Sequence, residues 1–118
     1  MLTGTYPNPG LASPESEHEI GAAGEPAFQT AWKNYDASNY ETTGFYKDPY
    51  GVVHLKGVVT GGTTGTGFIL PAGYRPALTA LFGNLSGDYV AVDPSGQVRI
   101  VGSTSVRTVD GITFRAGS

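Results

Sequence analysis

The 118-residue sequence contains no cysteine and little charge, since only 14% of its residues are Asp, Glu, Lys or Arg. Without cysteine the chain can form neither a disulfide framework nor a thiolate zinc site. The formal net charge of −3 argues against nucleic acid as a partner, because such partners normally require a basic stripe. The arginines form no such stripe, being spread over different predicted strands and turns: Arg75, Arg99, Arg107 and Arg115.

Long hydrophobic runs are also missing. No apolar stretch approaches the length of a membrane span, and the N-terminus lacks the basic-then-apolar pattern of a signal peptide. The sequence therefore predicts neither insertion into a membrane nor secretion by the general route.

Glycine and proline, in contrast, are abundant, with 18 and 8 copies. Both residues disfavour helix interiors, whereas short apolar runs separated by turns every eight to twelve residues are typical of all-β domains. We expect seven or eight short strands that form an antiparallel β-sandwich or jelly roll.

The first 25 residues differ from the remainder. Glu15, Glu17 and Glu19 alternate with polar residues and leave no apolar stripe to bury. Acidic residues also concentrate early, because residues 1–50 carry a balance of −5 and residues 51–118 a balance of +2. We interpret residues 1–25 as an extended linker or fibre-neck segment, or as a strand completed by another chain, and residues 26–118 as the β-sandwich domain.

Two tetrapeptides, Asp48-Pro49-Tyr50-Gly51 and Asp93-Pro94-Ser95-Gly96, have the residues that a type I turn favours. Each lies between two strand-like runs, so each predicts a β-hairpin. The positions after the first turn alternate, with Val53, Leu55 and Val59 on one face and His54 and Lys56 on the other.

Aromatic residues cluster early: Phe28, Trp32, Tyr35, Tyr40, Phe45, Tyr46 and Tyr50. Residues 28–35 fit either a short helical turn or a strand. Trp and Tyr present a flat apolar face with a polar edge, which suits stacking on a sugar ring. Phe28 and Phe45 are expected in the core. For the remaining candidates the sequence is compatible with either a buried or an exposed ring. We predict that the saccharide contacts are Trp32, Tyr35, Tyr40 and Tyr50.

Signals for catalysis are weak. His18 and His54 have no motif around them, and no Gly-x-Ser-x-Gly elbow is present. The Gly/Thr loop at 60–67 lacks the lysine and the following helix of a phosphate cradle. A glycosidase pair drawn from Asp36, Glu41 and Asp48 would need a cleft that a chain this short has little room for. We predict no enzyme, no catalytic residue, no metal site and no cofactor.

Several segments occur in an order and at a spacing that resemble those of a known family. They are Leu-Thr-Gly-Thr-Tyr-Pro-Asn-Pro at 2–9, Gly-Glu-Pro-Ala-Phe-Gln at 24–29, Trp32, Asn34-Tyr35, Lys47-Asp48, Gly-Val-Val-His-Leu-Lys-Gly at 51–57, Leu-Pro-Ala-Gly-Tyr-Arg-Pro at 70–76 and Asp-Gly-Ile-Thr-Phe-Arg at 110–115. The first resembles a segment that recurs in bacteriophage tail-fibre shafts and necks, and the others resemble the receptor-binding tip domain that follows it.

This resemblance implies a homotrimeric, all-β module of a virion fibre, on the tail or the capsid, that binds a host cell-surface glycan without catalysis. Its expected partners are copies of itself, the glycan and another fibre protein. The resemblance assigns no glycan-contact residue, so the candidates remain the aromatic residues named above. Two alternatives stay open: a purely structural trimerisation or capping module of a tail or capsid fibre, and a small hydrolase.

Overall fold

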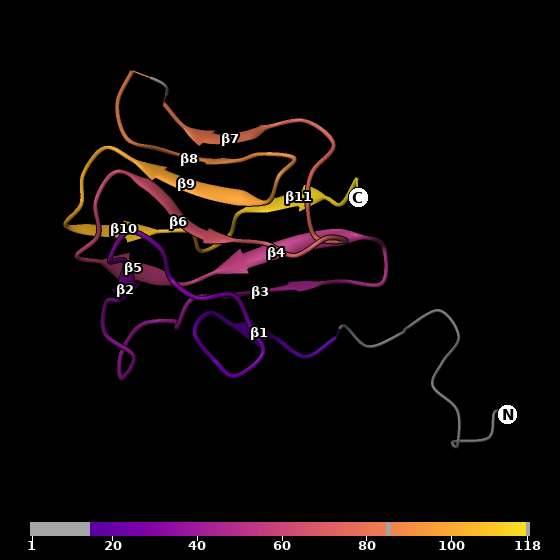
Figure 1. Cartoon of the computed structure of the whole chain (residues 1–118), viewed down its shortest axis with the longest axis horizontal. Helices are drawn as coiled ribbons and strands as arrows, with labels where there is room; N and C mark the ends of the chain where they lie inside the picture. The colour runs from indigo at the N-terminus through magenta and orange to yellow at the C-terminus, as the bar shows by residue number, and fades with distance from the viewer. Residues whose placement is uncertain (1–14, 85, 118) are drawn as a thin grey trace, which may run out of the picture.

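The computed structural model describes residues 15–84 and 86–117, and within them the chain forms antiparallel strands and no helix (Figure 1). One sheet has the order β1 (His18–Glu19), β3 (Gly44–Lys47), β4 (Val52–Lys56) and β11 (Thr113–Arg115). A second has the order β10 (Val106–Thr108), β5 (Val58–Thr60) and β2 (Lys33–Asn34). A third has the order β6 (Gly65–Ile69), β9 (Gln97–Val101), β8 (Tyr89–Val92) and β7 (Ala80–Gly83). No helix in these ranges is long and apolar enough to cross a membrane.

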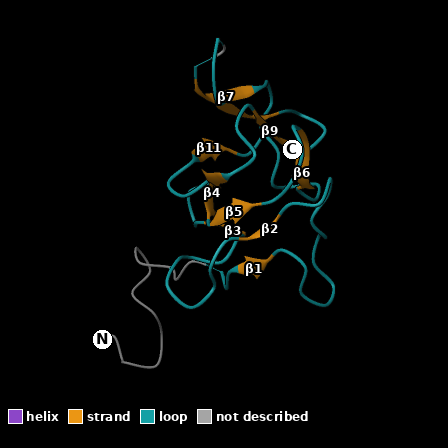
Figure 2. Ribbon diagram, turned by 90° about the vertical axis from the view of Figure 1, so that its left-hand side faces the viewer, coloured by secondary structure: helices purple, strands orange, loops and turns teal. Residues whose placement is uncertain are grey.

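The predicted all-β, antiparallel fold class is confirmed, and the packing is compatible with a β-sandwich. In Figures 1 and 2, β7 and β9 lie above β4, β5 and β3, and β1 lies below them, and one buried cluster takes residues from all three sheets. Its largest fully buried members include Phe45, Val53, Val59, Phe68, Leu70, Val98 and Ile100. Burial of these apolar faces against one another is the main stabilising contribution available to a chain without disulfides.

Both predicted turns form, and they close the β3–β4 and β8–β9 hairpins. In each, the glycine N–H donates to the aspartate carbonyl, at 3.0 Å for Gly51 and 2.8 Å for Gly96. Both glycines have positive φ, 83° and 90°. A type I turn followed by a left-handed residue is a common way to connect two antiparallel strands, because it matches their twist.

A bend at Gly57 organises the lower part of the molecule. Gly57 has φ 123° and separates β4 from β5, so one strand passes from the first sheet into the second. A Cβ at this position would lie 2.4 Å from the Thr43 Cα, and only glycine permits that approach. Within the described part of the chain, two neighbouring segments have no strand pairing at this bend. Residues 35–43 form the loop between β2 and β3, and residues 109–112 connect β10 to β11.

The structure differs from the boundary expected after residue 25. His18 and Glu19 form β1, which pairs with β3, and Ile20 is buried in the core. Gly44 allows this pairing, because a Cβ there would lie 2.5 Å from the His18 carbonyl oxygen. Residues 15–25 thus belong to the domain, although Ile20 is the one large apolar side chain in this Glu-rich segment that indicates it. Residues 1–14 of the expected linker lie outside the described residues.

Residues 28–35 form neither a helical turn nor a strand throughout. Thr30 and Ala31 have left-handed φ values of 51° and 68°, which break the segment before β2 begins at Lys33. The break turns the Trp32 indole inward, where its ring N–H donates to the Thr63 carbonyl at 2.8 Å. Gly62 packs directly on that ring, and the indole is part of the core.

Candidate functional site

The strongest candidate site is the loop of residues 35–42, here called the aromatic loop. Its base is closed by Asn34, whose side-chain oxygen accepts hydrogen bonds from the Thr43 N–H and hydroxyl, both at 2.8 Å. Its tip is shaped by Asp36, whose carboxylate accepts from the Ser38 N–H at 3.1 Å and from the Asn39 side-chain amide at 2.9 Å. The bond from Asn39 is the main reason that the pKa of Asp36 is lowered. The loop therefore has a defined conformation without packing against the core.

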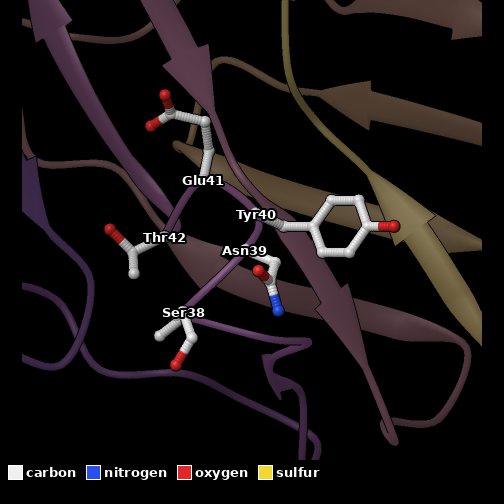
Figure 3. Close-up of a pocket in the computed structure, with 6 residues that line it drawn as sticks. Ser38, Asn39, Tyr40, Glu41 and Thr42 are labelled. Atoms are coloured by element: carbon white, nitrogen blue, oxygen red, sulfur yellow. The ribbon is translucent and has the colours of Figure 1, made fainter.

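Two aromatic rings stand on this loop in contact with each other. The ring centroids of Tyr35 and Tyr40 are 5.2 Å apart with an interplanar angle of 55°, and the residues are 43% and 52% exposed. Residues 37–42 line a hollow of about 390 Å³ beside them, here called the loop hollow. Figure 3 shows the Tyr40 ring extending sideways from the loop while Ser38 and Glu41 point in opposite directions. Exposed rings next to hydroxyl, amide and carboxylate groups are the combination that sugar binding uses.

The other two predicted contact residues do not join this pair. Trp32 is only 2% exposed, so its indole has no face free to stack on a ligand, and it is removed from the candidate set. Tyr50 is 73% exposed but belongs to the β3–β4 turn, at the end of β4 remote from the aromatic loop. In Figure 1 that turn lies at the right-hand edge and the aromatic loop at the lower left.

A second hollow, of about 260 Å³, opens on the outer face of the first sheet and is here called the sheet hollow. Tyr46 and His54 form a cross-strand pair along it, with parallel rings 4.7 Å apart. The His54 Nε2 is 2.9 Å from an oxygen of Asp48, and this bond is the main cause of the lowered pKa of that carboxyl. The ring pair is thus held at a fixed orientation by the turn that closes its own hairpin.

Lys56 lies between the two hollows and forms ion pairs with several glutamates. Its Nζ is 2.9 Å from Glu19, 3.6 Å from Glu17 and 3.5 Å from Glu41, and it donates to the Thr42 carbonyl at 2.7 Å. Burial lowers the pKa of this ammonium, but the carboxylates outweigh burial and the pKa is raised. Lys56 therefore stays charged and ties the aromatic loop to β1 and β4.

A separate cluster fastens the N-terminal segment to the domain. The His18 Nδ1 is 2.8 Å from Glu25, its Nε2 is 3.1 Å from Glu15, and its ring stacks on Phe45 at 4.8 Å. The hydrogen bond with Glu25 is the main cause of the raised pKa of His18. Burial, aided by a hydrogen bond to Glu15, raises the pKa of the Tyr74 phenol to about 12, so Tyr74 remains a donor at neutral pH.

Sequence reasoning missed the sheet hollow, although a signal for it exists. Once the turn at residues 48–51 is assigned, Asp48 faces Val52, and counting outward pairs Tyr46 with His54. Alternation then puts both rings on the outer face. Contacts between segments that are distant in the sequence cannot be found by counting in this way. An example is the hydrogen bond that the Asp110 carboxylate accepts from the Gly57 N–H at 3.3 Å. Within the described ranges, no group of three or more His, Asp or Glu residues is arranged to hold a metal ion.

Comparisons with known proteins assign no family to the chain. No family model matches it, and neither curated proteins nor solved structures give a match.

Proposed function

We propose that the chain is a non-catalytic saccharide-binding module of a virion fibre, and that it contacts a host cell-surface glycan through the aromatic loop. The observation that carries the proposal is the exposed Tyr35–Tyr40 pair beside the loop hollow. The loop hollow beside Tyr40 also offers the hydroxyl of Ser38, the amide of Asn39 and the carboxylate of Glu41 as hydrogen-bonding groups for a sugar. The sequence resemblance to trimeric fibre tips supplies the virion location and the expectation of a homotrimer.

Trimeric assembly would suit weak sites of this kind. The loop hollow is open and shallow, so one site binds a sugar weakly by comparison with an enclosed pocket. Three identical sites on one particle raise the effective affinity through avidity, without any further contact.

The test is a glycan array probed with the parent chain and with Tyr35→Ala and Tyr40→Ala. Tyr50→Ala is the matched control, since it removes an exposed tyrosine from the remote turn. We expect about tenfold weaker binding for the two loop variants, because an aromatic contact of this kind contributes about 1 kcal/mol or more. Binding by both loop variants at the parental level, with their fold intact by circular dichroism, would contradict the assignment.

A second candidate, a purely structural trimerisation or capping module, is favoured by one edge of the molecule. Strand β7 is an edge of its sheet, and Leu81 on that strand and Leu78 before it are 42% and 81% exposed. Exposed strand edges with apolar side chains favour association with another chain. Light scattering on the parent and on Leu81→Lys would test assembly, with a trimer expected for the parent and a lower mass for the variant. Trimer formation with no saccharide bound on the array would support this second candidate.

A further inference from the structure

The loop hollow and the sheet hollow share a wall. Glu41 lines both, and Lys56, which lines the sheet hollow, donates from its Nζ to the Thr42 carbonyl and hydroxyl at 2.7 and 3.2 Å. Both hollows lie at the Gly57 bend, where residues 35–43 and 109–112 leave the ladder on opposite sides of the same strand. The two hollows therefore adjoin, with Glu41 as their common boundary.

The sheet hollow has its own aromatic surface. Tyr46 covers one face of the His54 ring, and Thr113 is the neighbour of His54 on the other side, in register on β11. Thr113 is exposed and short, so the second face of the imidazole borders the hollow. Because Asp48 holds the ring at 2.9 Å, this face is fixed in orientation before any ligand arrives.

The charges around the hollows restrict the ligand. Glu17, Glu41 and Asp110 line the sheet hollow, whereas its cation, Lys56, is shared among Glu17, Glu19 and Glu41, so the lining keeps a net negative charge. Free carboxylate oxygens accept hydrogen bonds from sugar hydroxyls and repel carboxylate groups on a ligand. A neutral sugar fits this surface, and a sugar acid does not.

We propose that the two hollows are adjacent subsites of one site for a neutral oligosaccharide of at least two sugar units. One unit lies against Tyr40 in the loop hollow, and the next lies against His54 in the sheet hollow, with Glu41 between them. This inference rests on the proposed saccharide function and adds to it the length and charge class of the ligand.

The experiment titrates the full chain with linear neutral oligosaccharides of one to six glucose, galactose, mannose or N-acetylglucosamine units, and with uronate oligosaccharides of matched length. We expect affinity to rise at least tenfold from one to two or three units. His54→Ala should abolish that gain, whereas Tyr40→Ala should weaken ligands of every length. Uronate oligosaccharides should bind at least tenfold more weakly than neutral ones of equal length at low salt.

Arg99→Ala is the matched control, because Arg99 occupies the position of His54 in the β8–β9 hairpin, and it should behave as the parent chain. Equal affinity for all lengths, or uniform weakening by His54→Ala, would overturn the second subsite and leave the proposed function intact. Equal or tighter binding of uronates would overturn the neutral class. Failure of every oligosaccharide to bind would overturn the proposed function, and this inference with it.

Discussion

The β3–β4 and β8–β9 hairpins are built on the same turn but have different surroundings. Their registers are equivalent, since Phe45 faces Leu55 as Val90 faces Ile100, and both pairs are buried. On the outer face, the cross-strand pair two residues from the turn aspartate is Tyr46 and His54 in the first hairpin. In the second hairpin, the corresponding pair is Ala91 and Arg99, and Ala91 is only 1% exposed, so this face of β8 is covered.

The turn aspartates also make different contacts. Asp48 lies 2.9 Å from the His54 Nε2, whereas Asp93 is 4.0 Å from the Arg99 Nε, a buried nitrogen to which residues 15–84 and 86–117 supply no hydrogen-bond partner. The same turn therefore gives the same register in both hairpins, but the corresponding faces are covered differently: Tyr46 and His54 are partly exposed, whereas Ala91 is buried. The partly exposed face of the first hairpin carries a ring stack beside a hollow.

The largest expected difference between the hairpins lies at their glycines. Gly96→Ala should lower the free energy of unfolding by about 3 kcal/mol, because left-handed φ costs a side chain about 1–2 kcal/mol and overpacking adds a similar amount. A Cβ at Gly96 would lie 2.4 Å from the Leu70 carbonyl oxygen. A Cβ at Gly51 would meet no atom within 4 Å in the described part of the chain, its two sequence neighbours aside, so Gly51→Ala should cost only about 1 kcal/mol, from the φ of 83°.

Urea unfolding of the parent and the two variants measures this difference. Equal losses in both variants would mean that the turn environment does not distinguish the hairpins. A Gly51→Ala variant as stable as the parent would contradict the left-handed conformation of that residue.

The second prediction concerns the aspartate of the second turn. The Asp93 Oδ1 accepts from the Ser95 N–H at 3.0 Å and the Gln97 N–H at 3.1 Å, so Asp93→Ala should cost about 1–2 kcal/mol. Asp48→Ala should destabilise in the same direction, because its Oδ1 accepts from the Tyr50 and Val52 N–H groups. Thermal unfolding of both variants, with Asp93→Asn as the control that keeps an acceptor, would check this.

The loss of stability caused by Asp93→Ala should become smaller at low pH. Burial raises the pKa of this carboxyl, but the hydrogen bonds from Ser95 and Gln97 outweigh it, and the pKa is lowered from 3.8. The charged form's contribution is therefore fully present above pH 3.8 and disappears as the pH falls through the lower, folded-state pKa. The stability gap between the parent and Asp93→Ala should shrink over that interval, and a constant gap would argue against the lowered pKa.

The sequence indicates local features of this fold more clearly than distant ones. The turns at residues 48–51 and 93–96 and the alternation of Val53 and Leu55 follow from local chemistry, and they are confirmed. The pairing of β1 with β3 was missed, because Ile20 is the one large apolar residue in the segment around β1 and the partner strand lies far along the chain. Local propensity does not carry such long-range pairing.

The candidate site divides in the same way. The turn-forming residues between Tyr35 and Tyr40 allow both rings to be exposed but do not require it. The sequence therefore left burial and exposure of these rings open, and the structure shows both exposed. The burial of Trp32 depends on left-handed backbone at residues 30–31 and on the distant Gly62, neither of which the spacing of aromatics indicates. Tyr50 is exposed as its turn position allows, but its distance from the other tyrosines is set by the length of β4.

The third prediction is that the stability of the strand flanking the first hairpin depends on pH, whereas that of the strands flanking the second does not. The first hairpin is flanked by β1, which has a two-residue ladder and the His18–Glu25 contact, whereas the second is flanked by longer ladders to β6 and β7. The raised pKa of His18 means that its contribution is fully present below pH 6.5 and is lost as the pH rises through the higher folded-state pKa. Because the side chain is 30% exposed, the effect should stay under about 1 kcal/mol.

Hydrogen exchange at the β1 and β7 amides between pH 6 and 9, corrected for intrinsic exchange, would detect the loosening in β1 alone. His18→Gln should remove the pH dependence, since glutamine keeps a polar side chain and carries no titrating proton. Equal loosening of β1 and β7 in the parent would show that this cluster does not hold the first hairpin selectively.

The smallest expected effect comes from replacing His54 by arginine, the residue at the corresponding position of the other hairpin. In His54→Arg, the guanidinium can pair with Asp48 and lie over the Tyr46 ring, so the free energy of unfolding should change by no more than about 0.5 kcal/mol. The ring pair stands on the outer face, and its partial exposure makes it a small contributor to the core. Near-parental stability by urea unfolding would leave the stack free for ligand contact, because the fold does not depend on it. A loss above about 2 kcal/mol would instead make the stack a structural element of the first hairpin.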